Sequence, residues 1–504
     1  LLYYAMDKCL PIAPLKIDQL KSNITFGELQ KMSHADLSEW VDATRLELLE
    51  LWDNGIPPYQ GMDVQTIQDK FSKLKDFKSG AKYFEDELYT DYKGFIKNFS
   101  KMANGVNQFF PALLKTRING KSIYDYFTNE NLHQEFKHTI VQKVRFDKIY
   151  TYTKYIISKD KEDYQQFVDW VESRSGDIKF WVENWNFNAM NEKLNRLRLS
   201  SDEVKKLRQQ GVIKALNENN HDGFNDIDET PTFYTIRYYD KTQKIYPKMF
   251  QVLRIGLNQV ATNFPVFTAR WIYQNYLKTE SPELQYKVYD SSAGWGGRML
   301  GALCSKLPIL YIGTDVNTEN KGCYESLGEF YHKHADKKNT YEIHYVGSEE
   351  IGNTKLLDGH YNDVDLVFTS PPYFNKELYS DDAEQSSVKY PKYDDWLEQF
   401  LYPTLETSYR LLKPERYMLI NISDIKLEES RFIPLEQDTI QTAMKIGFKY
   451  RGKLGMCMTR AIGTKPSDMK NYWVDTNSNT TYKIEPILIF KKIVEYPWDE
   501  GSDE

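Results

Sequence analysis

The feature that most constrains the fold of this chain is an alternation of short apolar runs with longer amphipathic ones in its second half. The apolar runs read as strands, and the segments between them have the spacing of helices. Strands that are apolar throughout are typical of parallel sheets covered on both faces. The pattern therefore predicts a doubly wound α/β sheet with strands at 286–290, 309–315, 342–346, 364–370 and 417–422.

The two ends of the chain differ from this pattern. Near the C-terminal end, the apolar runs 448–458 and 483–493 predict an antiparallel pair that closes the sheet. Near the N-terminal end, most segments have helical spacing, and the stretch 216–232 has the Asn, Asp, Gly and Pro content of a linker. We therefore expect a mainly helical N-terminal domain at 1–230, an α/β domain at 231–496 and an acidic tail at 497–504.

The composition narrows the class of protein. With 41% hydrophobic and 27% charged residues, the chain is typical of globular proteins. A net charge of −7 argues against a chain that is basic throughout, although nucleic-acid binding needs only a local basic groove. The sequence has no apolar run of membrane-spanning length, no signal-peptide pattern and no CxxC spacing. We therefore expect no membrane partner, no metal site and a cytoplasmic location.

A turn of small residues follows the first predicted strand. The stretch VYDSSAGWGGRML ends a strand at Asp290 and begins a helix near Arg298. Its glycines permit positive φ and a close approach of a ligand to the backbone, and ligands of open α/β sheets bind at the carboxyl ends of the strands. The spacing is neither GxGxxG nor GxxxxGK[ST]. A ligand-binding turn and a merely tight turn are both consistent with it.

Acidic residues follow the next two strands. Asp315 is placed to hold a ribose diol, but it is equally suited to cap the helix that follows. Glu349, in the turn after the third strand, is placed to receive a purine amino group, or it simply begins a solvated helix. The residues by themselves leave both alternatives open at each position.

The fourth strand ends on the sequence TSPPYF. Neither proline can donate a hydrogen bond to a neighbouring strand, so the strand must stop there. Ser370 and the Pro371 carbonyl can accept hydrogen bonds from an exocyclic amino group, and Tyr373 can stack on the ring that carries it. The alternative, a proline-terminated strand with a core tyrosine, fits less well in a sheet whose first turn is rich in glycine.

Taken in order, these motifs resemble the S-adenosylmethionine-dependent DNA amino-methyltransferases, which methylate N4 of cytosine or N6 of adenine. DSSAGWGGR, GTDVN, GSEE and TSPPYF carry the resemblance, and NFPVFTARWIY at 263–273 resembles the family's additional cofactor motif. The resemblance covers 234–492. It implies a Rossmann-like class I methyltransferase fold, S-adenosylmethionine as the cofactor and double-stranded DNA as the substrate.

The resemblance also implies roles for individual residues, with the target base flipped out of the duplex and its amino nitrogen attacking the methyl group in line. The implied catalytic residues are Ser370, Pro371, Pro372 and Tyr373. The implied nucleic-acid contacts are Phe374, Arg460, Lys465 and Lys470. The implied cofactor-binding residues are Phe264, Pro265, Asp290, Ser292, Gly294, Trp295, Gly296, Gly297, Asp315, Val316, Ser348, Glu349 and Ser370.

Two departures from the family pattern bear on the expected activity. Ser291 and Ser292 stand where the family more often has Pro and an aromatic residue, which shifts cofactor stacking to Trp295 or Phe264. The catalytic motif begins with Ser, which is more usual in N4-cytosine enzymes than in N6-adenine ones. We therefore favour N4 of cytosine over N6 of adenine. An RNA amino-methyltransferase and a non-catalytic nucleic-acid-binding subunit are the remaining alternatives.

The sequence also bears on partners. C5 methylation of cytosine is disfavoured, because that chemistry needs a thiolate, usually after a proline, and no cysteine here follows a proline. The short distance between the glycine turn and the TSPPYF motif leaves no space for a target-recognition domain between them. A restriction or specificity subunit is therefore an open question, and such a restriction-modification setting would place the chain in a bacterial or phage-infected cell.

Overall fold

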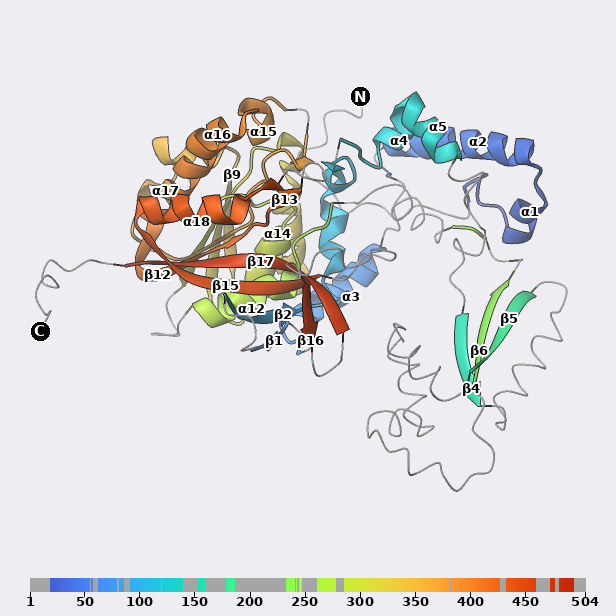
Figure 1. Ribbon diagram of the computed structural model, residues 1–504, viewed down its shortest axis with the longest axis horizontal. Coiled ribbons are helices and arrows are strands. Elements are labelled where there is room, and N and C mark those ends of the chain that lie inside the picture. Colours follow the sequence, from blue (N-terminus) through green and yellow to red (C-terminus); the bar gives the residue numbers. More distant parts are fainter. Residues whose placement is uncertain are drawn as a thin grey trace, which may run out of the picture.

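A computed structural model describes most of the chain, and Figure 1 shows a central sheet with helices on both of its faces. The described residues are 19–54, 56–57, 62–78, 81–85, 91–118, 120–138, 153–158, 178–185, 233–240, 242, 244–246, 261–277, 285–380, 382–426, 432–458, 472–475 and 480–493.

The central sheet has ten strands in the order β1-β2-β15-β17-β12-β10-β7-β8-β9, with β16 paired to β17. The strands from β12 to β9 run parallel, and β17 runs antiparallel to both β12 and β15. This confirms the predicted doubly wound sheet and its antiparallel C-terminal strands. The C-terminal half supplies β7 (Tyr286–Asp290), β8 (Ile309–Thr314), β9 (Thr340–His344), β10 (Val364–Thr369), β12 (Leu412–Asn421), β15 (Phe448–Met458), β16 (Tyr472–Asp475) and β17 (Thr480–Lys492).

Helices cover the two faces because side chains of the parallel strands point alternately to either side. Leu366 and Phe368 of β10 pack into one apolar core, and Val367 between them packs into the other. The first core contains α12 (Val266–Tyr276), α13 (Gly297–Leu303) and α14 (Cys323–His334). The second core contains α16 (Tyr393–Trp396), the π-helical turn η9 (Leu397–Leu401), α17 (Tyr402–Leu411) and α18 (Leu435–Ile446).

The N-terminal region begins with the helices that the sequence predicts. Helix α2 (His34–Asp53) starts at a capping box of Ser33 and Asp36 and ends at Asn54, and it buries Trp40 and Leu48 among other apolar residues. Around it lie α1 (Phe26–Lys31), α4 (Asp125–Thr128) and α5 (Glu130–His138), and further along the chain α3 (Val64–Leu74).

Part of the N-terminal region belongs to the central sheet, which differs from the expected separate helical domain. β2 (Tyr92–Lys97) pairs in parallel with β15, and β1 (Lys82–Phe84) pairs with β2. Helix α3 and the 3-10 turn η2 (Asn104–Phe109) pack against α14. Long-range strand pairing has no local sequence signature, so short strands inside a helical region escape a reading based on periodicity.

The expected boundary near residue 230 lies outside the described residues. Strand β6 (Phe233–Asp240), on the far side of that boundary, pairs with β4 (Thr153–Ser158) and β5 (Ile178–Trp185) on the near side. These strands form a separate three-stranded sheet (Figure 1). In the sequence, the 216–232 stretch therefore lies between two strands that pair in one sheet.

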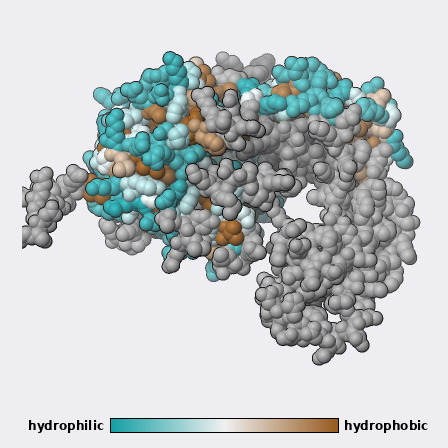
Figure 2. Space-filling model, in the orientation of Figure 1, coloured by the Kyte–Doolittle hydropathy of each residue, from teal (hydrophilic) through white to brown (hydrophobic). Residues whose placement is uncertain are grey.

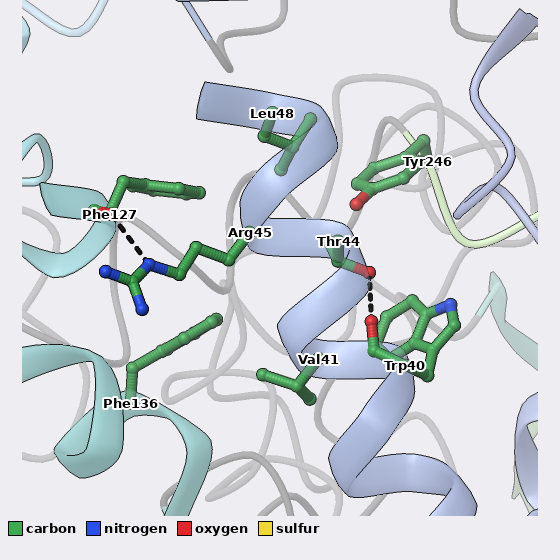
Figure 3. Close-up of a pocket in the computed structure, with 8 residues that line it drawn as sticks. All are labelled: Trp40, Val41, Thr44, Arg45, Leu48, Phe127, Phe136 and Tyr246. Atoms are coloured by element: carbon green, nitrogen blue, oxygen red, sulfur yellow. Dashed lines mark hydrogen bonds between the residues drawn. The ribbon is translucent and has the colours of Figure 1, made fainter. Parts of the chain in front are cut away.

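A small cavity lies in the N-terminal helical region, far from the strand ends of the central sheet. Its volume is about 10 Å³, enough for about one water molecule, so it is a packing gap and too small for a cofactor or base. Figure 3 shows Arg45 beside it, donating through Nε to the Phe127 carbonyl at 2.8 Å, and Thr44 donating to the Trp40 carbonyl at 2.7 Å. The lining is completed by Val41, Leu48, Phe136 and Tyr246.

The face drawn in Figure 2 is mainly hydrophilic over its described residues, with small separate hydrophobic areas. Among the described residues, no helix is long and apolar enough to span a membrane. Single exposed apolar side chains are normal on protein surfaces. The larger ones here are Leu46, Val64, Phe99, Leu356, Val388, Phe432, Met444 and Val474.

Candidate active site

The glycine turn and the SPPY motif meet at the point where the sheet reverses its strand order. β7 lies between β8 and β10, so the chain leaves β7 in one direction and returns to its other side at β10. Ser291, just after β7, donates through Oγ to Thr369 Oγ1 at the end of β10 at 3.0 Å. Thr314 at the end of β8 donates to the Ser291 carbonyl at 2.7 Å. Such a switch point is where open α/β sheets bind ligands.

The glycines of the turn serve two different purposes. Gly296 has φ +70°, and a Cβ there would lie 2.7 Å from the Phe110 ring. A Cβ on Gly297 would lie 2.4 Å from the Phe264 carbonyl oxygen. These two glycines are required by packing within the protein. Gly294 has φ +60°, but a Cβ there would meet nothing nearer than 3.7 Å, so its open side is compatible with a ligand.

Asp290 lies behind the turn in a buried ion pair. Its Oδ2 accepts from Arg298 Nε at 2.7 Å and from the Tyr311 hydroxyl at 2.6 Å, and its Oδ1 accepts from the Ser292 N–H at 3.1 Å. The Asp290 side chain is 0% exposed. Both oxygens are therefore occupied by the protein, and Asp290 acts in this structure by fixing the start of α13. The predicted direct contact of Asp290 with the cofactor stays a prediction.

Asp315 follows β8 at the same edge of the sheet. Its carboxylate accepts from the Tyr324 hydroxyl, from Asn320 Nδ2 at 3.0 Å and from the Asn317 N–H at 2.8 Å. Burial raises the pKa of Asp315, although these three donors oppose the rise. These hydrogen bonds show that Asp315 holds the loop after β8 in place. Asp315 also lies beside Gly294, because the Tyr324 hydroxyl contacts both Asp315 and the Gly294 carbonyl.

The residues after β9 lie nearer the outer side of this edge. Glu349 accepts from Lys389 Nζ at 3.4 Å, and burial raises the pKa of its carboxyl group. Ser348 is buried and its Oγ pairs with Thr404 Oγ1 at 2.9 Å. Their cofactor contacts, and that of Val316 beside Asp315, stay predictions.

Aromatic side chains lie at and around the glycine turn. The Trp295 ring lies 5.5 Å from that of Tyr379, which follows the SPPY motif. Phe264, just before α12, packs edge-on against Phe368 of β10 at 5.3 Å, with the Arg298 guanidinium 5.4 Å from its ring. Pro265 caps α12. The structure therefore brings the candidate stacking residues Trp295 and Phe264 to the same turn.

The SPPY motif leaves the end of β10 as the sequence predicts. Ser370 Oγ donates to Asn421 Oδ1 at 3.3 Å, and the Tyr373 hydroxyl donates to Glu485. Tyr373 is half-buried and packs against the second core. This placement is compatible with a ring that offers a face to a base.

Phe374 differs from its expected role as a nucleic-acid contact. The structure places it in the second core, 5% exposed, 5.3 Å from Tyr393 and 5.9 Å from Trp396. Its φ of +48° lies in the left-handed region. Of the two adjacent aromatics, Tyr373 is the less buried. The other expected contacts, Arg460, Lys465 and Lys470, lie outside the described residues.

Three charged residues that the sequence does not single out lie near Tyr373. Burial raises the pKa of both Glu485 and Glu377, and burial beside Lys483 lowers the pKa of Lys376. Glu377 accepts from the Tyr379 hydroxyl at 2.5 Å. A sequence signal for Glu485 exists, because it interrupts the apolar run of its strand. In the described part of the chain, no cluster of His, Cys, Asp or Glu has the arrangement of a metal site.

A doubly wound α/β sheet with a glycine turn and an SPPY corner at its switch point defines a Rossmann-like protein with a candidate ligand site at its strand ends. Residues 364–500 match the family model N6_N4_Mtase, described as DNA methylase. This match over part of the chain, with the relative described next, confirms the resemblance to the DNA amino-methyltransferases.

Individual relatives are more distant. The Type II methyltransferase M.MjaI of Methanocaldococcus jannaschii is 27% identical over 157 residues, which are 26% of this chain and 50% of that protein. The chain thus spans about half the length of this curated relative. A SAM-dependent methyltransferase of Methanosarcina mazei is 14% identical with a TM-score of 0.28, covering 44% of this chain and 98% of that one. One of Agrobacterium tumefaciens is 11% identical with a TM-score of 0.29, covering 47% and 65%. TM-scores of this size do not establish a shared fold. The fold assignment rests on the strand order of the central sheet.

Proposed function

We propose that this chain is an S-adenosylmethionine-dependent DNA methyltransferase that modifies the exocyclic amino group of a base, with N4 of cytosine favoured. The observation that carries the proposal is the meeting of two motifs at one switch point, joined by the Ser291–Thr369 hydrogen bond. N6 of adenine is the alternative acceptor. The match to a DNA methylase family over residues 364–500 supports DNA as the substrate.

The residues at this edge suit the proposed cofactor. Gly294 leaves space beside its backbone, Asp315 offers a carboxylate to ribose hydroxyls, and Trp295 and Phe264 offer ring faces to an adenine. When bound, S-adenosylmethionine supplies a methyl group on a sulfonium that a neutral nitrogen can attack. Ser292, next to Gly294, has its carbonyl occupied by Arg298, so the turn is held in shape before the cofactor arrives.

The acceptor base is held by the SPPY motif. Tyr373 stacks on the flipped base, and Ser370 with the Pro371 carbonyl accepts hydrogen bonds from its amino group. These bonds orient the nitrogen lone pair toward the methyl group, so most of the rate enhancement comes from positioning. The proton that the nitrogen releases after transfer passes to solvent.

One experiment tests the proposed function directly. Plasmid DNA is incubated with the purified chain and S-adenosylmethionine carrying a labelled methyl group, and the DNA is digested for nucleoside mass spectrometry. We expect labelled N4-methyl-2′-deoxycytidine, and labelled N6-methyl-2′-deoxyadenosine would identify the alternative base. Label only in a parallel RNA reaction would replace DNA by RNA as substrate. No label in any nucleic acid, with the cofactor bound, would make the chain a non-catalytic binding subunit.

Asp315→Asn tests the cofactor site. Removing the charge weakens the hydrogen bonds from the ribose hydroxyls to this side chain. A hydrogen bond to a charged group contributes about 1.5–3 kcal/mol, and the amide replaces part of it. We therefore expect the Kd for S-adenosylmethionine to rise about tenfold. Calorimetric titration measures it. Asp358→Asn, an exposed carboxylate on another turn, is the matched control. An unchanged Kd in the Asp315 variant would contradict the assignment.

Affinity for the cofactor should also depend on pH through Asp315. Burial raises the pKa of this carboxyl above its ordinary value of 3.8. As pH falls toward that raised pKa, the carboxylate is protonated and loses its charge, so cofactor affinity should weaken at a higher pH than an ordinary aspartate would give. The pH dependence should be absent from the Asp315→Asn variant.

A further inference from the structure

The last described strand, β17, carries two residues that lie beside the SPPY motif. Strand β17 lies between β12 and β15, with Ile487 opposite Asn421 and Glu485 opposite Met456. It thereby brings Glu485 and Pro486 next to the end of β10, more than a hundred residues earlier in the chain. A carboxylate at this position is unexpected, because the residues around it in β17 are mostly buried and apolar.

The two ends of the SPPY motif are linked to Glu485 and Pro486 of β17, one end directly and the other through Asn421. At one end, the Tyr373 hydroxyl donates to Glu485 Oε1. At the other, Ser370 Oγ donates to Asn421 Oδ1 at 3.3 Å, and Asn421 Nδ2 donates to the Pro486 carbonyl at 3.0 Å. Asn421 is 2% exposed, so its side chain is held between the two partners.

The surroundings of Glu485 favour a lasting bond to Tyr373. Burial raises the pKa of Tyr373, so its hydroxyl keeps its proton and stays a donor. Burial raises the pKa of Glu485, and the Tyr373 hydroxyl, Lys483 and Lys376 oppose that rise. In either protonation state the carboxyl group keeps an oxygen that can accept from the Tyr373 hydroxyl.

We propose that Glu485 is a positioning residue for methyl transfer: through the Tyr373 hydroxyl it fixes the plane of the ring on which the target base stacks. The proposal rests on the proposed function. A tyrosine ring turns about χ2 in a broad energy well, so packing at one edge alone leaves its tilt poorly defined. A fixed acceptor at the hydroxyl restricts this freedom in two ways. It holds the far end of the ring against rotation about χ1, and, because a phenolic O–H lies in the plane of its ring, it favours the χ2 that turns this plane toward Glu485. The parallel link from Pro486 through Asn421 holds Ser370 in the same frame.

The test uses the full chain and separates the hydroxyl contact from the ring. Tyr373→Phe keeps the ring and removes the donor, and Glu485→Leu keeps the volume and removes the acceptor. Each should lower kcat for DNA methylation about tenfold to a hundredfold, as expected for a misplaced reacting group. The double variant should lose no more than either single variant, because both break one contact. Glu485→Gln retains an acceptor and should recover much of the loss.

A control variant and the cofactor Kd distinguish a general loss of structure from a loss of ring positioning. Glu436 of α18 is another carboxyl group whose pKa is raised by burial, and it pairs with Lys453 of β15 at 3.0 Å. Glu436→Gln is the control and should leave kcat unchanged. The Kd for S-adenosylmethionine should stay within about twofold in every variant, since a distant contact adds little to its affinity.

The outcomes divide clearly. Multiplying losses in the double variant, or a raised cofactor Kd in place of a lowered kcat, would overturn the proposal. If Glu485→Leu does not fold, Tyr373→Phe decides: full activity in that variant shows that the hydroxyl contact is not needed. An inactive wild-type chain that still binds the cofactor would instead refute the proposed function.

Discussion

Replacing Tyr373 with alanine is expected to lower kcat for DNA methylation at least about a hundredfold, because stacking contributes about 1–3 kcal/mol per base and orientation is lost with it. The ring is the one aromatic of the SPPYF corner that the structure leaves half-buried at the switch point. The proposed cofactor-binding residues Gly294 and Asp315 lie on the turns after β7 and β8. Affinity for S-adenosylmethionine should therefore be retained.

The measurement is a methylation time course at saturating DNA, with the cofactor Kd from calorimetry. Tyr402→Ala is the matched control, since Tyr402 is also half-buried but lies on α17 with Lys445 over its ring at 5.5 Å. Normal turnover by the Tyr373 variant would remove its stacking role. A loss of both turnover and cofactor binding would show that the substitution disturbs the whole edge of the sheet.

The second large effect is expected from Asp290→Asn, which should lower the free energy of unfolding of the sheet domain by about 3–5 kcal/mol. The substitution leaves the Arg298 guanidinium, 6% exposed, without its carboxylate. A buried charge that loses its partner keeps the full cost of its desolvation. Because Arg298 also donates to the Ser292 carbonyl, the glycine turn should loosen and cofactor affinity should fall as well.

Urea denaturation followed by fluorescence measures this change. Glu415→Gln serves as the control, because Glu415 pairs with Lys491 in the same sheet but its side chain is 55% exposed. Exposed ion pairs contribute about 0–1 kcal/mol, so the control should differ little from the wild-type chain. Equal destabilisation in the two variants would show that the Asp290–Arg298 pair has no special structural role.

The sheet and its two motifs could be predicted from the sequence because their signals are local. An apolar run that ends on Asp290 before three closely spaced glycines, and another that ends on Ser-Pro-Pro-Tyr, each specify a strand and its stop. The alternation of runs gives parallel pairing, and parallel pairing brings both stops to one edge. The antiparallel pair of β15 and β17 follows from the same kind of signal.

Other features depend on contacts between distant segments, and the sequence misses them. β2 joins the central sheet beside β15, and Phe110 packs against Gly296. These parts of the N-terminal region therefore pack against the glycine turn and the central sheet. Likewise, two of the three glycines are explained by protein packing, which their spacing alone cannot distinguish from ligand binding.

By itself, the sequence determined the parallel sheet, the strand ends that carry the candidate site, and the SPPY corner, because strand stops and glycine turns are set by the few residues that form them. Only the tertiary structure decided that Phe374 is a core residue while Tyr373 is only half-buried, that Asp290 is paired to Arg298, and that Glu485 accepts a hydrogen bond from Tyr373. The reason is physical: which side chain is buried, and which partner it meets, depends on the pairing of strands far apart in the chain.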